Sequence, residues 1–96
     1  MNEPPMFKFR LYVAGDTQNS MQALANLTKI CQTYLVHSHE IEVLDVFKEP
    51  DLTLKEGVFM TPTLVKLSPS PMIKIVGTLS QTQIILQALG LDTPSA

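Results

Sequence analysis

The chain has 96 residues, of which 45% are hydrophobic and 17% are charged. This length suits one domain, and the hydrophobic fraction suits a folded globule rather than a disordered chain. Seven basic and nine acidic residues give a net charge of −2, which removes the electrostatic driving force for non-specific nucleic-acid binding. No apolar run approaches the ~20 residues of a membrane-spanning helix, so we expect neither nucleic-acid nor membrane binding.

The single cysteine, Cys31, excludes an internal disulfide, and the N-terminus is neither basic nor apolar like a signal peptide. Together these features predict a cytoplasmic protein. No linker or repeat interrupts the chain, so we predict a single domain over residues 1–96. We expect about residues 1–6 and 92–96 to be its flexible ends.

The first predicted strand covers residues 7–13, where apolar residues alternate with polar or amphipathic ones. One set is Phe7, Phe9, Leu11 and Val13, and the other is Lys8, Arg10 and Tyr12. A period of two residues is typical of a strand. A polar, turn-rich segment follows over residues 15–20, in which Asn19 or Ser20 is suited to cap a helix.

A helix is predicted after this turn, because apolar residues recur at spacings of three and four. They are Ala23, Leu24, Leu27, Ile30, Cys31, Tyr34 and Leu35. A second strand is predicted over residues 41–47. Strand, helix and strand at this spacing form a right-handed crossover, so the two strands are expected to be parallel.

The second half begins with an ambiguous segment, residues 51–61, which fits a short helix weakened by Gly57. Residues 64–67 and 72–76 are predicted strands, joined as a hairpin by a turn that holds Pro69 and Pro71. Pro62 precedes the hairpin, and there we expect a cis peptide bond. The strand of residues 62–67 is expected to offer a sheet edge, which is also a route to self-association.

The last predicted helix follows a capping box, in which Ser80 and Gln83 satisfy each other's backbone amides. Its apolar stripe is Ile84, Ile85, Ala88 and Leu89, and Gly90 is suited to a left-handed helix cap. The order β-α-β-(α)-β-β-α predicts an α/β, thioredoxin-like fold with a mixed four-stranded sheet.

Thioredoxin chemistry is not predicted, because residues 14–17 carry no thiol where thioredoxins place Cys-x-x-Cys. Cys31 is expected in the core, with a redox-sensing thiol as the alternative. His37 and His39 are interpreted as solvated loop histidines without further metal ligands nearby. Asp45 is expected to bond a backbone group at a strand end. We therefore predict no catalytic residue, no cofactor and no metal.

Four blocks of the sequence resemble the KaiB family, the small clock-associated proteins that partner the KaiC ATPase. Residues 11–20 (LYVAGDTQNS) resemble the family's opening, and residues 44–50 (LDVFKEP) its strand end. Residues 60–66 (MTPTLVK) and 75–80 (IVGTLS) are similar to two later family segments. The blocks follow in order from residue 11 to residue 80.

The resemblance implies a non-enzymatic protein that docks on a KaiC-like ATPase or a sensor histidine kinase. It also implies a homo-oligomer, a dimer or tetramer, and a second, ground-state arrangement in which the C-terminal half is rebuilt. The alternatives are a redox-responsive thioredoxin-like protein with one cysteine and a self-assembling structural oligomer.

Several positions that are basic in clock-type relatives are uncharged or acidic here, which favours a role in bacterial signalling or stress response over a circadian clock. They are Pro5, Gln22, Ala25, Thr28, Glu42, Gly57 and Ile73. We predict five partner-binding residues: Lys8, Arg10, Tyr12, Lys66 and Lys74. We also predict four residues that shape or switch the fold: Pro62, Pro69, Pro71 and Gly77.

Overall fold

The structure is a computed structural model, which describes residues 6–91. Its elements in chain order are β1 (Phe7–Val13), α1 (Gln18–Tyr34), β2 (His39–Asp45), α2 (Pro50–Lys55), β3 (Thr63–Ser68), β4 (Ile73–Val76) and α3 (Thr82–Leu89). Of the flexible ends expected at about residues 1–6 and 92–96, all but residue 6 lie outside the described residues. The second strand begins and ends two residues earlier than the sequence pattern predicted.

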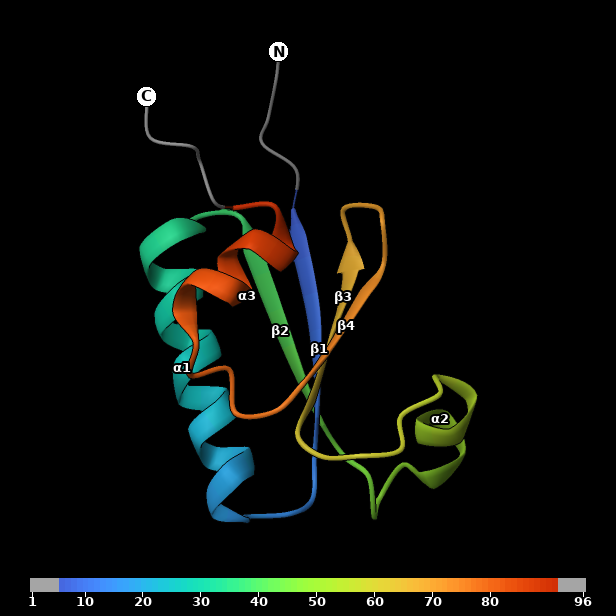
Figure 1. The fold of residues 1–96 in the computed structure, drawn as a ribbon. Helices are drawn as coiled ribbons and strands as arrows, with labels where there is room; N and C mark the ends of the chain where they lie inside the picture. Colours follow the sequence, from blue (N-terminus) through green and yellow to red (C-terminus); the bar gives the residue numbers. More distant parts are fainter. Residues whose placement is uncertain (1–5, 92–96) are drawn as a thin grey trace, which may run out of the picture.

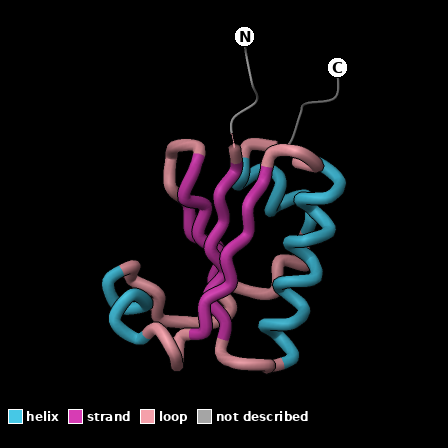
Figure 2. Tube along the Cα trace, turned by 180° about the vertical axis from the view of Figure 1, so that it is seen from behind, coloured by secondary structure: helices cyan, strands magenta, loops and turns pink. Residues whose placement is uncertain are grey.

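The four strands form one mixed sheet in the order β2-β1-β3-β4. β1 runs parallel to β2 and antiparallel to β3, and β3 pairs antiparallel with β4. Helices α1 and α3 cover one face of this sheet, and the short α2 lies toward the other face at one end (Figures 1 and 2). The predicted thioredoxin-like fold is confirmed, and this is the arrangement in which the structure holds the C-terminal half.

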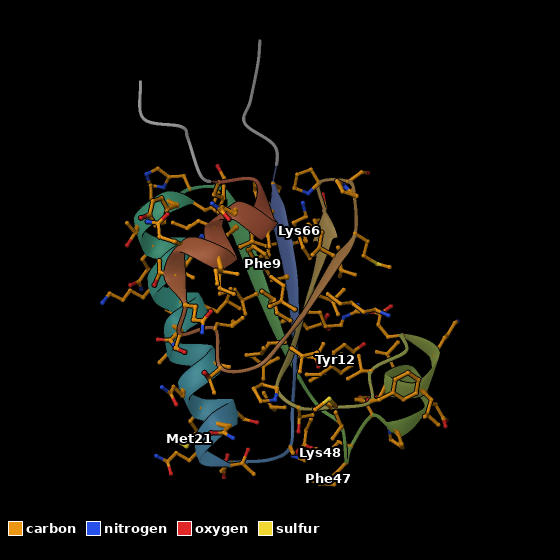
Figure 3. The ribbon with its side chains drawn as sticks, viewed as in Figure 1. Phe9, Tyr12, Met21, Phe47, Lys48 and Lys66 are labelled. Carbon is orange, nitrogen blue, oxygen red and sulfur yellow. The ribbon has the colours of Figure 1, made fainter. Side chains whose placement is uncertain are left out.

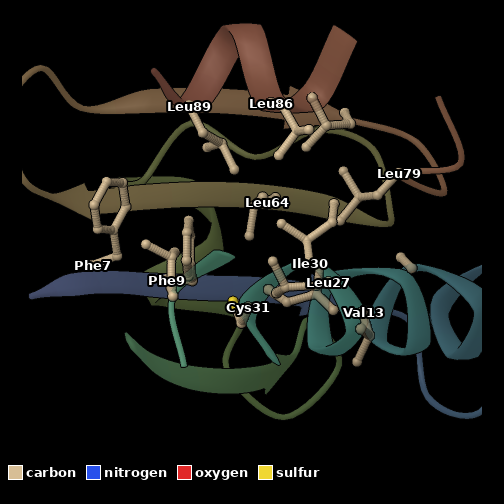
Figure 4. Close-up of a cluster of buried hydrophobic side chains, with 14 residues drawn as sticks. Phe7, Phe9, Val13, Leu27, Ile30, Cys31, Leu64, Leu79, Leu86 and Leu89 are labelled. Atoms are coloured by element: carbon tan, nitrogen blue, oxygen red, sulfur yellow. The ribbon is translucent and has the colours of Figure 1, made fainter. Parts of the chain in front are cut away.

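The main core fills the space between the sheet and the two longer helices (Figure 4). Leu11 of the central strand β1 pairs with Val43 on one side and with Leu64 on the other. Leu27 of α1 and Leu89 of α3 are almost fully buried in the same cluster. Each such side chain contributes about 1.5–3 kcal/mol through burial, so this face provides most of the folding free energy.

The opposite face holds a much smaller cluster, made of Tyr12, Val58 and Val65. It lies under the segment that joins α2 to β3, and α2 fastens to the sheet beside it. Only the end of this face nearest α2 is closed in this way.

The helix starts differ from the predicted caps. Thr17, rather than Asn19 or Ser20, is the N-cap of α1, and no side chain bonds the free amides there. The Ser20 hydroxyl instead accepts bonds from the Ala14 backbone at 3.2 Å and from the Thr17 hydroxyl at 2.8 Å. The predicted capping box of α3 is also wrong, because Gln81 is the N-cap and makes no side-chain bond.

The end of α3 agrees with the sequence, since Gly90 has a φ of 75° and caps the helix in the left-handed region. The predicted stripe of this helix is partly wrong. Ile84 is exposed, and Leu86 is buried beside Ile85 and Leu89. Leu79, just before the helix, also has a positive φ of 63°, and its side chain is buried.

The expected sheet edge at residues 62–67 is wrong, because β3 lies between β1 and β4. The edges are β2 and β4 instead. The peptide bond between Thr61 and Pro62 is cis as predicted, and those preceding Pro69 and Pro71 are cis as well.

Candidate partner-binding surface

The position where thioredoxins carry their thiols is occupied by residues 14–17, which lead from β1 into α1. The only thiol, Cys31, is fully buried in the main core, and burial raises its pKa to about 11. A thiol that is covered and protonated at neutral pH is a poor nucleophile. The core placement of Cys31 agrees with the prediction, and the redox-sensing alternative loses support.

The two histidines do not converge with other ligands. The Nδ1 of His39 lies 2.6 Å from the Leu35 carbonyl oxygen at the start of β2, whereas His37 is exposed. Across residues 6–91 there is no group of three or more His, Cys, Asp or Glu residues that could hold a metal ion. Asp45 accepts a bond from the Phe47 backbone at 2.9 Å, as expected for a strand-end carboxylate.

Among residues 6–91, no helix has both the length and the apolar character needed to cross a membrane.

Four of the five predicted partner-binding residues share one face of the sheet, and three of these keep some exposure to solvent. Lys8 and Arg10 on β1 and Lys74 on β4 point to the side away from α1 and α3, because they alternate with core residues. Lys8 and Lys74 are exposed, and Arg10 is partly buried. Their role in binding stays a prediction, and this face is where it would operate.

The exposure expected for the other two residues is wrong. Tyr12 is 0% exposed, because the chain between α2 and β3 closes over it. Lys66 is 4% exposed and lies on the opposite, helix-covered face, with its ammonium group 5.7 Å from the centre of the Phe7 ring. A lysine stem buried along apolar surface with its charge over an aromatic ring is a stable arrangement. Neither residue presents its side chain to a partner in this conformation.

Arg10 is the centre of a polar network that joins three elements (Figure 3 labels the neighbouring Tyr12). Its guanidinium donates at 2.9 Å to Glu42 on β2 and at 2.9 Å to Glu56, the C-cap residue of α2. The Tyr12 hydroxyl donates to the same Glu56 carboxylate at 3.2 Å. The bond to Glu42 is the largest cause of a raised Arg10 pKa, and burial raises the pKa of Tyr12. The network fastens α2 to the sheet.

Close to this network, large apolar side chains stand exposed around a shallow crevice of about 250 Å³. Phe47, Phe59 and Met60 are 76%, 84% and 63% exposed, although all three line the crevice. Val46 and Val58, which are less exposed, also line it. We call this site the α2 crevice. Exposed aromatic and methionine side chains around a concave surface are typical of protein-binding sites.

A second groove, of about 360 Å³, opens at the same end of the sheet between α1 and β2. Met21 and Lys48 lie on its rim, and Gly15 and Asp45 line it at the ends of β1 and β2 (Figure 3 labels Met21, Phe47 and Lys48). Met21 is exposed. The two hollows lie at the same end of the sheet, and each has exposed apolar side chains in its lining.

The residues of the α2 crevice were not among the predicted site residues. Phe47 had been placed inside the second strand, and Phe59 on a possible short helix. Phe47 instead follows the strand in a turn, and Phe59 lies in the loop after α2. One feature of the sequence could have indicated the crevice: Phe59 and Met60 are large apolar residues in a segment without helical or strand periodicity.

Two of the four predicted structural residues, Pro62 and Gly77, meet at this end as well. Gly77 has a φ of 121°, and its backbone donates to the Pro62 carbonyl at 2.9 Å. This bond ties the loop before α3 to the start of β3. Pro69 and Pro71 are far from it, in the turn between β3 and β4.

The chain matches the KaiB domain family model over residues 10–91. It belongs to the KaiB family. A circadian clock protein KaiB3 of Synechocystis is 41% identical over 83 residues, which cover 86% of this chain and 79% of the relative. A circadian clock oscillator protein KaiB of Synechococcus is 39% identical over 92 residues, 96% of this chain and 82% of the relative.

Solved structures of low sequence identity share the fold. The N-terminal domain of Synechococcus elongatus SasA superposes with a TM-score of 0.75 at 18% identity, covering 100% of this chain and 94% of that domain. Mitochondrial thioredoxin 3 of Saccharomyces cerevisiae gives a TM-score of 0.71 at 23% identity, covering 91% and 80%. This KaiB-family chain therefore has the thioredoxin architecture without the thiol pair.

Proposed function

We propose that this KaiB-family protein is a non-enzymatic regulator that binds a KaiC-like ATPase or a sensor histidine kinase through the α2 crevice. The carrying observation is the exposure of Phe47 and Phe59, 76% and 84%, on either side of an apolar hollow. Leaving two aromatic rings in water forgoes several kcal/mol of burial, on the order of 1.5–3 kcal/mol each. A partner that covers them recovers that free energy.

Charges on the same face of the sheet and beside the neighbouring groove support the same surface. Lys8 and Lys74 are exposed on the sheet face that α2 partly covers, and Lys48 lies on the rim of the neighbouring groove. Apolar anchors surrounded by charged residues are the usual anatomy of a binding site, in which the anchors give affinity and the charges steer association.

The proposed role is in bacterial signalling, in a stress response rather than in a circadian oscillator, and in the cytoplasm. Three of the positions that carry basic residues in clock-type relatives, Gln22, Ala25 and Glu42, are exposed here without positive charge. Glu42 is moreover occupied by its ion pair with Arg10. A partner surface built for those cations would find a different charge pattern on this protein.

The test is a binding measurement between the purified full chain and the purified KaiC-like ATPase of the same organism, with ATP and with ADP. Replacing Phe47 and Phe59 by Ala is expected to weaken the complex at least about tenfold, as loss of aromatic anchors commonly does. Met72→Ala is the matched control, because Met72 is an exposed apolar residue in the turn at the far end of the β3–β4 hairpin.

The outcomes separate the partners. If the protein binds only the sensor kinase, the kinase is the partner and the ATPase is not, and the crevice remains the proposed site. Binding that is equally strong for the Phe47 and Phe59 variants would show that the crevice is the wrong surface. If neither partner binds at micromolar concentration, the proposed function is refuted.

A further inference from the structure

The sulfur atoms of the described chain divide into one hidden thiol and several exposed thioethers. Cys31 is fully buried, and its raised pKa keeps the thiol protonated at neutral pH. Methionine is among the side chains most often buried in folded proteins, yet every methionine within residues 6–91 is between 41% and 63% exposed. They are Met6, Met21, Met60 and Met72. An oxidant that reaches the folded protein therefore meets thioethers before it meets the thiol.

Met60 differs from the other three in its surroundings. It lines the α2 crevice together with the exposed rings of Phe47 and Phe59. Its main chain is held in place by Thr63 at the start of β3, whose hydroxyl donates to the Met60 carbonyl at 2.6 Å. Thr63 is itself buried. The Met60 thioether is therefore open to a small oxidant and is also part of a fixed apolar surface.

The crevice offers little to satisfy a new polar atom. Within the part of the chain that the structure describes, no charged side chain lines it, and its two hydroxyl-bearing residues are both threonines. One of them, Thr53, already donates to the Glu49 carbonyl at 2.6 Å. Met21, by contrast, lines the neighbouring groove together with charged residues such as Lys48 (Figure 3). An oxygen atom added at Met60 changes its surroundings more than one added at Met21.

We propose that Met60 is a reversible oxidation site that determines whether the α2 crevice is apolar, with hypochlorous acid as the oxidant. The thioether sulfur attacks chlorine and hydroxide leaves, and water then displaces chloride from sulfur and forms the S–O bond. Sulfur loses the two electrons that chlorine gains, and the products are the sulfoxide, chloride and one proton. Methionine sulfoxide is a polar side chain, so its formation disrupts an apolar surface.

The modification can be reversed without a cysteine of this chain. Two methionine sulfoxide reductases exist, one for each epimer of the sulfoxide. A dithiol supplies the two electrons and becomes a disulfide, and the sulfoxide oxygen leaves as water. The thioether of Met60 and the apolar crevice are then restored.

The effect of this oxidation on partner binding rests on the proposed function. A partner that covers Phe47, Phe59 and Met60 removes water from the crevice, and a sulfoxide oxygen at Met60 would then be buried without a hydrogen-bond donor. Burying an unpaired polar group is unfavourable, and the expected loss of affinity is about tenfold or more. The oxidised chain is therefore expected to release its partner.

The oxidation site can be tested on the full chain without a partner. After treatment with a small molar excess of hypochlorous acid, peptide mass spectrometry should find sulfoxide at Met60, and Cys31 should remain a thiol. The apolar dye anilinonaphthalene sulfonate then reports on the crevice. Its binding should weaken severalfold on oxidation and recover with both reductases and dithiothreitol. The Met60→Leu variant has a similar side-chain volume without the sulfur, so its dye binding should not change on oxidation.

Binding to the purified KaiC-like ATPase or sensor kinase is the second measurement. Oxidation should weaken binding of the wild type and of the matched control Met72→Leu about tenfold, and should leave binding of Met60→Leu unchanged. If the untreated chain binds neither partner, the proposed function fails, whereas the dye and mass spectra still test the oxidation site. The inference is overturned if Met60 is not oxidised or if the untreated chain binds no dye. It is also overturned if oxidation affects the wild type and Met60→Leu equally.

Discussion

The two faces of the sheet are stabilised in different ways. The face under α1 and α3 is closed by apolar packing around Leu11, Leu27 and Leu64. The face toward α2 has a small apolar cluster, and α2 is fastened there by ionic and polar bonds to Glu56. Folding free energy is therefore concentrated on one face. The stability that the core provides offsets the free energy lost by leaving aromatic side chains exposed on the other face.

The largest expected effect is on the helix-covered face. Leu27→Ala should lower the free energy of unfolding by about 3 kcal/mol, because it removes buried methyl groups and leaves a cavity. Leu54→Ala is the control on α2, where the side chain is exposed and the loss should stay within about 0.5 kcal/mol. Both values come from denaturant titrations. Equal losses at the two positions would contradict the contrast between the faces.

Alkaline pH should weaken the same covered face. Burial raises the pKa of Cys31 from 9.0 to about 11, so its thiolate is disfavoured in the folded state. Below pH 9 the ionisation of Cys31 does not lower the free energy of unfolding. As the pH rises toward 11, the free energy of unfolding falls by on the order of 2 kcal/mol. The measurement is the free energy of unfolding against pH for the wild type minus that for Cys31→Ala. Tyr12, whose pKa burial also raises, contributes to both variants and cancels.

The α2 face should respond to loss of one carboxylate. Glu56→Gln is expected to cost about 1.5 kcal/mol, since Arg10 and Tyr12 both donate to this partly buried group. Glu42→Gln removes the other ion pair of Arg10, but Glu42 is largely exposed and the cost should stay below about 0.5 kcal/mol. Hydrogen exchange should show faster opening of α2 in the Glu56 variant alone. Uniformly faster exchange would mean that α2 is part of the main core.

The smallest expected effects are at the glycines with positive φ that follow α2 and α3, one on each face of the sheet. Gly90 and Gly57 have similar φ values, 75° and 74°, after α3 and after α2. Alanine at either position should cost about 1 kcal/mol, because side chains disfavour the left-handed region. At Gly57 the new methyl also meets the Lys74 ammonium group, which is mobile enough to move aside. Thermal melts of the two variants should therefore show equal losses of stability.

Local sequence patterns predicted the elements better than their surroundings. Alternation over residues 7–13 predicted β1 with the correct ends, and Gly90 predicted the end of α3. The burial of Tyr12 could not be read in this way, because it depends on Val58 and Glu56, more than forty residues away in the chain. Helix caps failed for a local reason. Ser20 bonds the strand end at Ala14 instead of a helix amide.

The candidate site was predicted only in part. The expected edge at residues 62–67 could not be corrected from the residues of β3 alone, because its only consecutive apolar residues are Leu64 and Val65. The lysines that were predicted to bind a partner lie on two different faces, because the side of the sheet that each occupies depends on strand register. The exposure of the Phe47 and Phe59 rings depends on where the main chain turns, and this cannot be predicted from the amino-acid composition.

Leu79 places two opposing demands on one position before α3. Its φ of 63° favours glycine, and its buried side chain favours a large apolar residue. Glycine would relax the backbone but empty the site, whereas a β-branched residue such as isoleucine would fill it at a higher backbone cost. The turn therefore accepts a narrower range of amino acids than the helix that follows it. Among randomly mutated copies of this gene, position 79 should be one of the least permissive.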